Sequence, residues 1–262
     1  MTFAILFCFY KELELCENRL QILKKYNPNL KVFGLYGGDK KSAEKYKKGL
    51  NNYLDDFYAT PYQNSFWKWL NYDLQILDWY KKRGKNLKWD SVFAVQWDML
   101  IFDSLLKQFK GIKKNQIFLS GLRLLDTKIE DTWNWTKPGS EYRKNYLEFL
   151  KYIKNNYNYK KTPLCCFFIL QVFPKIFFEK YLTVKNKEIG ILEYKVPIYA
   201  DIFKIPFYKK DIGVKWFEKE EKPINSGFGE ISKKYIAEQL NKKNGWRIFH
   251  PFLKIWKLDF KI

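Results

Sequence analysis

The chain has 262 residues, of which 47% are hydrophobic and 20% aromatic, and its formal charge at pH 7 is +20. This apolar content is enough for a sizeable core and excludes an intrinsically disordered chain. The excess of 48 Lys and Arg over 28 Asp and Glu favours anionic partners such as nucleic acid, phosphorylated small molecules or an acidic membrane surface, without choosing among them.

The first hundred residues alternate between two patterns. Runs rich in β-branched and aromatic residues predict strands, and apolar residues at helical spacing predict helices. The predicted strands cover residues 3–9, 31–38 and 92–102, and the predicted helices cover residues 13–26, 42–58 and 65–84. Alternation of this kind builds a parallel sheet with helices on its faces.

Beyond residue 116 the pattern is less regular. It predicts, in chain order, a short strand at 117–121, a loop at 131–142, a helix at 141–157, a buried strand and a helix within 162–182, a strand leading into a helix at 191–203, and a basic, aromatic tail from 245. No internal repeat or low-complexity linker divides the chain. We therefore expect one domain over residues 1–262.

The cysteine and histidine content limits the metal chemistry. Cys8, Cys16, Cys165 and Cys166 show no CxxC spacing, and His250 is the only histidine. A zinc site of the Cys and His type is thus nearly excluded, and a disulfide framework is not expected in a chain of this length. The apolar opening FAILFCF is far shorter than the roughly 20 residues that span a bilayer, so it is interpreted as a strand. We expect a cytoplasmic protein.

Asp98 is the one carboxylate inside the apolar run VFAVQWDMLIF, which Asp103 and Ser104 follow. Burying an unpaired carboxylate is costly, so such a residue usually meets a metal, a hydrogen-bond donor or the end of the sheet. In open α/β sheets, ligands bind outside the carboxyl ends of the strands, where a carboxylate can hold a cation on a diphosphate. The alternative is a solvated acid paired with a lysine, and the spacing leaves both interpretations open.

Three stretches in this order, SFWKWLNYDLQILDWYKKRG, QWDMLIFDS and IFHPF, resemble cytosolic glycosyltransferases of the GT-A class, which use nucleotide-diphosphate sugars. The resemblance implies an α/β fold: a single GT-A-like domain with a Rossmann-like, mostly parallel mixed sheet and helices on both faces. It also implies a nucleotide-binding half over residues 1–110 and an acceptor-side half over residues 111–262 that includes the basic, aromatic tail.

The resemblance further implies a cation site. In this class a strand leads into an acidic motif of the DXD type, and here Gln96, Trp97 and Asp98 occupy it. Asp98, assisted by Gln96, would hold Mn²⁺ or Mg²⁺ on the diphosphate, and His250 in FHPF would be a late ligand to the same ion. Gln96 is neutral where an acid usually stands, so we expect weaker metal affinity.

The donor site implied by the resemblance consists of Phe9, Tyr10, Lys11, Lys68, Asn71, Asp73, Gln96, Trp97 and Asp98. The first three would border the base and ribose, Lys68 would lie near phosphate, and Asp73 near the base, ribose or donor sugar. Each has a structural alternative. Asp73, for example, could be a helix-surface acid paired with a lysine.

Glu193 is the candidate general base that deprotonates or orients the acceptor hydroxyl. Its alternation with apolar residues places it on a strand, where it could also be an exposed edge charge. The same uncertainty between function and packing holds for His250.

The function implied is transfer of a sugar from a nucleotide-diphosphate sugar to a glycan or lipid-linked acceptor. The tail segment LKIWKLDFKI could add peripheral contact with the anionic inner face of a membrane. No nucleic-acid partner is expected, since neither an RNP-like motif nor a compact Lys/Arg run is present. Two alternatives remain open: a basic nucleic-acid-binding protein, and a GT-A-fold binding protein that has lost activity, which the neutral Gln96 would allow.

Overall fold

Strand β1 (Phe3–Phe9) lies in the middle of the central sheet, between β2 (Lys31–Tyr36) and β4 (Ser91–Gln96). It pairs in parallel with both neighbours, and β2 pairs in parallel with β3 (Asp56–Ala59) at one edge of the sheet. Every residue of β1 after the first is buried. This explains why β1 is a continuous apolar run, as expected of a parallel strand that is covered on both faces.

The sheet continues beyond β4 with β9 (Leu170–Pro174) and β6 (Phe118–Leu119), giving the order β3-β2-β1-β4-β9-β6. β9 runs antiparallel to both of its neighbours, so the sheet is mixed but mostly parallel. The structure is a computed structural model that describes residues 1–227 and 229–257.

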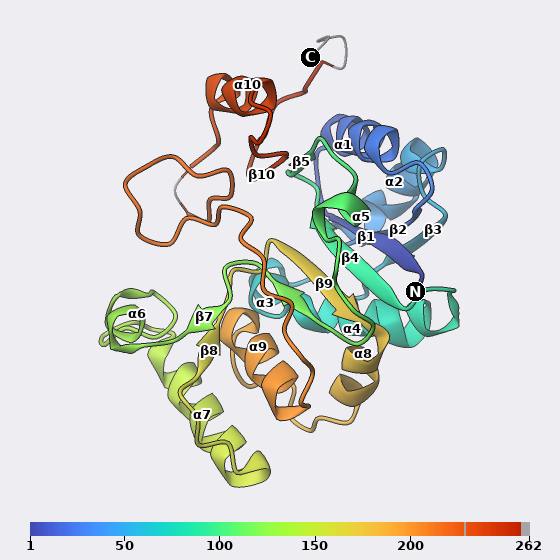
Figure 1. Cartoon of the computed structure of the whole chain (residues 1–262). Coiled ribbons are helices and arrows are strands. Elements are labelled where there is room, and N and C mark those ends of the chain that lie inside the picture. Colours follow the sequence, from blue (N-terminus) through green and yellow to red (C-terminus); the bar gives the residue numbers. More distant parts are fainter. Residues whose placement is uncertain (228, 258–262) are drawn as a thin grey trace.

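Helices cover both faces of this sheet. Figure 1 shows α1 and α2 on one side of it and α4 and α8 on the other. The α-helices in the described ranges are α1 (Leu13–Tyr26), α2 (Ala43–Leu50), α3 (Ser65–Leu70), α4 (Tyr72–Lys82), α5 (Leu105–Gln108), α6 (Thr127–Thr132), α7 (Arg143–Tyr157), α8 (Lys175–Leu182), α9 (Leu192–Ile202) and α10 (Lys233–Asn241). The predicted single α/β domain with a mostly parallel mixed sheet and helices on both faces is confirmed.

Two short strand pairs extend from this centre. β7 (Arg123–Leu124) pairs with β8 (Leu164–Cys165) and, with α6 and α7, forms an arm beside the sheet (Figure 1). β5 (Leu100–Ile101) pairs antiparallel with β10 (Ile248–Phe249), which brings the C-terminal segment back to the residues that follow β4.

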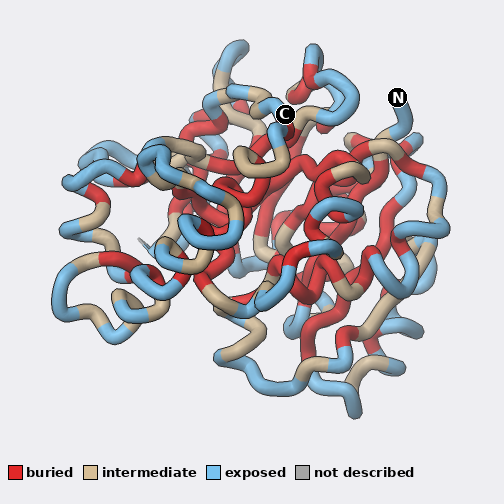
Figure 2. Tube along the Cα trace, turned by 90° about the horizontal axis from the view of Figure 1, so that it is seen from below, coloured by how far each residue is buried: buried red, intermediate tan, exposed pale blue. Residues whose placement is uncertain are grey.

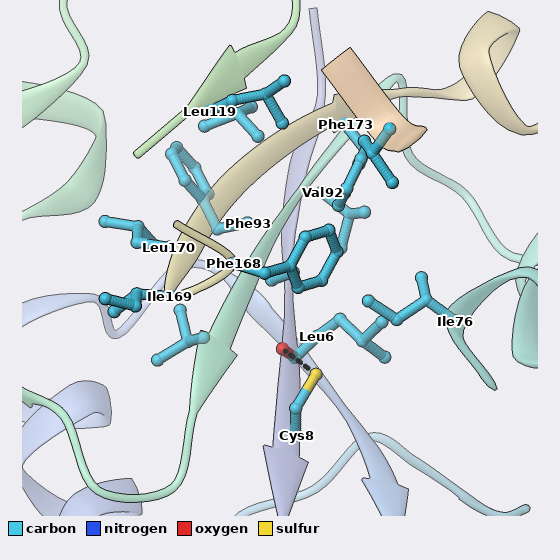
Figure 3. Packing of buried hydrophobic residues seen from close by; sticks show 14 of the residues in the cluster. Leu6, Cys8, Ile76, Val92, Phe93, Leu119, Phe168, Ile169, Leu170 and Phe173 are labelled. Carbon is cyan, nitrogen blue, oxygen red and sulfur yellow. Dashed lines mark hydrogen bonds between the residues drawn. The ribbon is translucent and has the colours of Figure 1, made fainter. Parts of the chain in front are cut away.

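The main core lies between the sheet and its helices. Buried positions run through the interior of the molecule, while exposed positions lie mostly around its outside, as Figure 2 shows. Leu6 of β1, Val92 of β4, Phe173 of β9 and Ile76 of α4 meet in this core (Figure 3). The thiol of Cys8 donates to the Leu6 carbonyl within it at 3.4 Å, so this cysteine is part of the packing.

One expected helix is divided in two, and one expected strand ends earlier than predicted. The expected helix over 65–84 breaks at Asn71, where non-helical backbone angles (φ −126°, ψ 37°) separate α3 from α4. The expected strand over 92–102 ends at Gln96, and a turn containing Asp98 precedes the short β5. Asp98 is therefore just past the end of its strand rather than inside it.

Two other predictions of secondary structure were wrong. The expected helix over 42–58 stops at Leu50, because residues 56–59 form the edge strand β3 beside β2. Residues 192–202 form helix α9 from Leu192 onward, with Pro197 inside it, so Glu193 lies in the first turn of a helix and not on a strand. Apolar residues around Glu193 are buried on all sides here, which removes the periodicity that distinguishes the two elements.

Among the described residues, no helix is both long and apolar enough to cross a bilayer.

Candidate active site

The order of the strands reverses at the carboxyl ends of β1 and β4. From β1 the chain builds outward through β2 and β3, then returns to the other side of β1 as β4. The residues that follow these two ends, Tyr10 and Lys11 after β1 and Trp97 and Asp98 after β4, therefore meet at one place. A backbone hydrogen bond of 2.9 Å from Trp97 to the Cys8 carbonyl joins them. In open α/β sheets this switch point is where ligands bind.

His250 reaches Asp98 from the far end of the chain. The two residues are brought together by the pairing of β5, which follows Asp98, with β10, which precedes His250. The Phe252 amide donates to the Asp98 carbonyl at 2.9 Å, so the residues on both sides of His250 are held against this part of the chain. As a result, His250 Nε2 lies 3.3 Å from Asp98 Oδ1, with both side chains mostly buried.

The hydrogen bonding of His250 limits the protonation states in which it can make this contact with Asp98. Its Nδ1 lies 2.9 Å from the Asn225 carbonyl oxygen, which can only accept, so Nδ1 carries a proton. In a neutral imidazole, Nε2 would then present a lone pair to a carboxylate oxygen that is buried and has no other hydrogen-bond partner in the described chain. Two acceptors at this distance repel each other, so the contact favours either an imidazolium or a cation that both atoms would hold.

Charge around Asp98 favours its ionised form. Burial by itself would raise the pKa of this carboxyl, but the charge and hydrogen bonding of His250, and the charge of Arg19, outweigh burial and lower the pKa. The site thus holds a carboxylate and an imidazole nitrogen at the switch point.

This donor set fits a divalent cation that is shared with a ligand. An imidazole nitrogen and a carboxylate oxygen suit Mn²⁺, and the carboxylate suits Mg²⁺. The described residues contain no group of three or more His, Cys, Asp or Glu that could hold a metal alone. Any ion here would need further oxygen ligands, such as those of a diphosphate and water.

A clamp on α1 holds the C-terminal segment in place. The Arg19 guanidinium is fully buried and donates to the carbonyls of Phe252 and Lys254, both at 2.7 Å. Asn18 exchanges two hydrogen bonds with the backbone of Trp256, at 2.9 and 3.0 Å. The clamp was not foreseen in the sequence, where Asn18 and Arg19 are two polar positions of an amphipathic helix. Only the return of a segment more than 230 residues later gives them partners.

Tyr10, Lys11 and Trp97 form an aromatic and cationic corner beside Asp98. The Tyr10 ring meets the buried Trp97 edge-on with centroids 5.4 Å apart, and Lys11 Nζ lies 5.3 Å from the Trp97 ring. Tyr10 is 51% exposed, so its ring is available to a ligand. The side chain of Phe9, by contrast, lies in the core against Tyr36, and only its backbone reaches the site.

Lys68 also lies at this edge. Its ammonium donates to the Gly37 carbonyl at 2.6 Å, and the Gly37 amide donates to the Phe9 carbonyl at 2.8 Å, so α3 is held over the ends of β1 and β2. A Cβ at Gly38 would come 2.5 Å from the Tyr10 carbonyl oxygen, which explains why glycine is needed for this close approach. Burial lowers the pKa of Lys68.

Asp73 and Asn71 lie in a different environment. The Asp73 carboxylate is almost fully buried, 3.1 Å from Lys195 Nζ and 2.5 Å from the Tyr181 hydroxyl. Asn71 accepts from the same lysine at 3.3 Å. The structure therefore does not bring Asp73 to the edge with Asp98. Its carboxylate joins α4 to α8 and α9. Asp73 is therefore paired with a lysine, as the structural alternative for this residue predicted, but the pair is buried and does not lie on the helix surface.

Phe168 connects the end of β4 to Glu193. The side-chain amide of Gln96 donates to the Phe168 carbonyl at 2.5 Å, and the Phe168 amide donates to Glu193 Oε1 at 3.1 Å. The second carboxylate oxygen of Glu193 accepts from the indole nitrogen of Trp135 at 2.5 Å. Glu193 is therefore two hydrogen bonds from Gln96, and Trp135 and Phe168 are site residues that the sequence did not reveal.

Burial raises the pKa of Glu193 to about 7, against the two hydrogen bonds from Phe168 and Trp135 that favour its charged form. A carboxyl with a pKa near neutrality can accept and release protons under ordinary conditions, which is the property of a general base.

Comparison with known proteins supports the fold of this site. No known sequence family matches the chain, and no curated protein does. A solved structure of WbbM, a bifunctional glycosyltransferase in its apo form, is similar to this chain with a TM-score of 0.50 at 10% identity. That alignment covers 97% of this chain and 46% of WbbM, so the chain spans about half of that protein.

A cytidylyltransferase from Leptospira borgpetersenii serovar Hardjo-bovis aligns with a TM-score of 0.43 at 12% identity, over 80% of this chain and 76% of that protein. At these identities the similarity to WbbM shows the fold alone.

Proposed function

We propose that the protein transfers a sugar from a nucleotide-diphosphate sugar to an acceptor hydroxyl, with a divalent cation shared between the diphosphate and the pair Asp98 and His250. The observation that carries this proposal is the buried contact of 3.3 Å between His250 Nε2 and Asp98 Oδ1 at the switch point of the sheet. A shared fold with a glycosyltransferase is consistent with it.

In the proposed reaction the acceptor oxygen forms a bond to the anomeric carbon of the donor sugar. The bond between that carbon and the diphosphate breaks, and its electron pair leaves with the nucleoside diphosphate. Glu193 takes the proton from the acceptor hydroxyl, which its pKa of about 7 permits. A divalent cation, when bound, would neutralise charge on the diphosphate.

Residues of the chain supply the rest of the proposed site. The exposed Tyr10 ring, supported by the buried Trp97, offers aromatic surface for the base, and Lys11 and Lys68 place positive charge beside the diphosphate. The side-chain NH₂ group of Gln96 donates its hydrogen bond to the Phe168 carbonyl. Its amide oxygen is the atom we propose as a weak, neutral ligand or as a partner for a ribose hydroxyl.

The test is a thermal-shift panel of nucleoside diphosphates, including uridine and guanosine diphosphate, with and without Mn²⁺. At about a hundred times the dissociation constant, a bound nucleotide should raise the melting temperature by roughly 5 to 10 °C. Asp98→Ala should abolish the part of the shift that depends on metal.

Asp103→Ala is the matched control, because Asp103 lies five residues further on and hydrogen bonds to Ser104 and Gln108 outside the site. Absence of any shift across the whole panel would overturn the proposal. A steep dependence of nucleic-acid affinity on salt, unaffected by Asp98→Ala, would favour nucleic-acid binding instead, in keeping with the charge of +20.

Turnover separates an enzyme from a protein that only binds. If Gln96 has abolished catalysis, nucleotide should bind while no sugar nucleotide in a panel is hydrolysed or transferred. Gln96→Asp should then strengthen the response to Mn²⁺ in the thermal-shift panel, because it adds a charged oxygen ligand.

We also propose peripheral contact with an acidic membrane surface through the C-terminal segment. Leu253 and Ile255 are 50% and 52% exposed on either side of Lys254, while residues 258–262 of the tail lie outside the described part of the chain. Co-sedimentation with vesicles containing phosphatidylserine tests this contact. Replacing both apolar residues with serine should reduce binding, while Leu106→Ser, at an exposed position on α5, should not.

A further inference from the structure

Four aromatic side chains form a connected cluster beside Glu193, here called the aromatic platform, in which Phe66 and Trp69 are exposed and Trp135 is buried. Phe66 and Trp69 come from α3, Trp135 from the loop after α6, and Tyr142 from the residue before α7. Neighbouring rings are in contact around the cluster: centroids are 6.1 Å apart for Phe66 and Trp69, 4.9 Å for Trp69 and Trp135, 4.7 Å for Trp135 and Tyr142, and 6.5 Å for Phe66 and Tyr142.

The platform is open to solvent on the side of α3. Phe66 is 53% exposed and Trp69 is 55% exposed, although they belong to a helix of only six residues. Single exposed apolar residues are common, but contiguous ones usually mark a binding site. The hydrogen bond from Lys68 to the Gly37 carbonyl anchors this helix, which carries the exposed rings, at the carboxyl edge of the sheet.

One residue joins the platform to the proposed base. Trp135 packs its ring against Trp69 and Tyr142, and at its edge the indole nitrogen donates to Glu193 Oε2 at 2.5 Å. Trp135 is itself only 9% exposed, so this one indole links the exposed rings of Phe66 and Trp69 to the Glu193 carboxylate. Glu193 in turn is linked through Phe168 to Gln96 at the end of β4.

This arrangement selects a chemical class of ligand. A pyranose ring has a flat face of C–H groups that packs on aromatic rings and a rim of hydroxyl groups that hydrogen bond to a carboxylate. The ionised form of Glu193, which is present above its pKa of about 7, would repel a phosphate or other anion, whereas either form can hydrogen bond to a hydroxyl group. The chain as a whole carries a charge of +20, yet the side chain at the border of this platform is an acid.

We propose that Phe66, Trp69, Trp135 and Tyr142 form the subsite that binds the pyranose ring of a neutral sugar acceptor and presents one of its hydroxyls to Glu193. This inference rests on the proposed function and names the acceptor class of that same site. Its structural basis is independent of the Asp98 and His250 pair, so the two proposals can fail separately.

The experiment measures binding of methyl β-glucoside, methyl β-galactoside, methyl β-N-acetylglucosaminide and the corresponding disaccharides to the full chain, by isothermal titration and by ligand-observed NMR. Mannitol is the control ligand, because it has hydroxyl groups but no ring face. Trp69→Ala and Phe66→Ala change residues that are more than half exposed, so the fold should persist. Phe217→Ala is the matched control at another aromatic residue, 43% exposed.

The expected result is binding of at least one sugar and none of mannitol. Trp69→Ala should weaken that binding about tenfold, and Phe217→Ala should leave it unchanged. The thermal shift produced by nucleoside diphosphate and Mn²⁺ should be the same in Trp69→Ala as in the unmodified protein.

Failure of every sugar to bind up to its solubility limit would overturn the acceptor subsite. Equal sugar affinity in Trp69→Ala and the unmodified protein would overturn it as well. If nucleotide still stabilises the protein in either case, only this inference falls. If nucleotide does not bind while sugars bind through Trp69, the proposed transferase function falls and the platform remains as a sugar-binding surface.

Discussion

His250 Nε2 lies 3.3 Å from Asp98 Oδ1, although the two residues are separated by 152 positions in the chain. The contact is set by the pairing of β5 with β10 and by the Asn225 carbonyl, which orients the imidazole through Nδ1. Through this contact the C-terminal segment joins the residues that follow β1 and β4 at the switch point of the sheet.

Ionisation of Asp98 should contribute to stability in the absence of metal. Because the fold lowers the pKa of this carboxyl, its contribution is present at neutral pH and is lost as the pH falls from the ordinary value through the lowered pKa. Urea unfolding in a chelator should show Asp98→Asn less stable than the unmodified protein at pH 7. The difference should shrink at pH of about 3. A difference that stays constant over this range would contradict the shift.

Glu193 should set the acid limb of the pH–rate profile. Its pKa of about 7 means that the base is protonated and inactive below that pH, so kcat/KM for transfer should rise through a midpoint near 7. Trp135→Phe removes a hydrogen bond to the charged form, so the midpoint should move to higher pH. Trp133→Phe is the control, because Trp133 packs on Phe167, whereas the side-chain oxygens of Glu193 accept from Trp135 and the Phe168 amide.

Ionisation of Glu193 should make the protein less stable as the pH rises. Glu193 is ionised above its ordinary pKa of 4.5 in the unfolded chain but only above a pKa of about 7 in the fold, so the free energy of unfolding should fall between these two pH values by something on the order of 3 kcal/mol. Denaturant titrations of the unmodified protein and Glu193→Gln over this range test it. The variant should show a flatter dependence, and parallel curves would exclude the raised pKa.

The buried Arg19 should be essential for the C-terminal segment. Arg19→Met leaves the carbonyls of Phe252 and Lys254 without their donor, which should cost about 2 to 4 kcal/mol of unfolding free energy. Hydrogen exchange at the amides of Phe252 and Trp256 should become faster in the same variant. Lys25→Met, at an exposed position on the same helix, should change neither measurement. Unchanged exchange in Arg19→Met would show that the clamp does not order the segment.

The buried pair Asp73 and Lys195 should behave as a structural unit. Lys195→Met leaves a buried carboxylate whose remaining partner is the Tyr181 hydroxyl, and the expected loss is about 3 to 5 kcal/mol. Adding Asp73→Leu removes that charge, so the double variant should recover much of the stability. Nucleotide affinity should be unchanged in the double variant. A large loss of affinity there would instead place Asp73 in the donor site.

The sequence by itself determined the alternation of strands and helices that builds the sheet, and it drew attention to Asp98 and His250. The reason is local: continuous apolar runs such as β1 and amphipathic spacing such as that of α1 fix the element type before any tertiary contact forms. A lone acid in an apolar run and a lone histidine are likewise visible without a structure.

Only the tertiary structure decided where those side chains go. Asp73 and Glu193 are both acids among apolar residues, yet one is buried against Lys195 and the other has a pKa near 7 beside Trp135. The difference comes from partners more than 50 positions away in the chain, and no local pattern encodes them. The same holds for Arg19, whose carbonyl partners exist only because the strand pairing of β5 and β10 folds the end of the chain back onto its beginning.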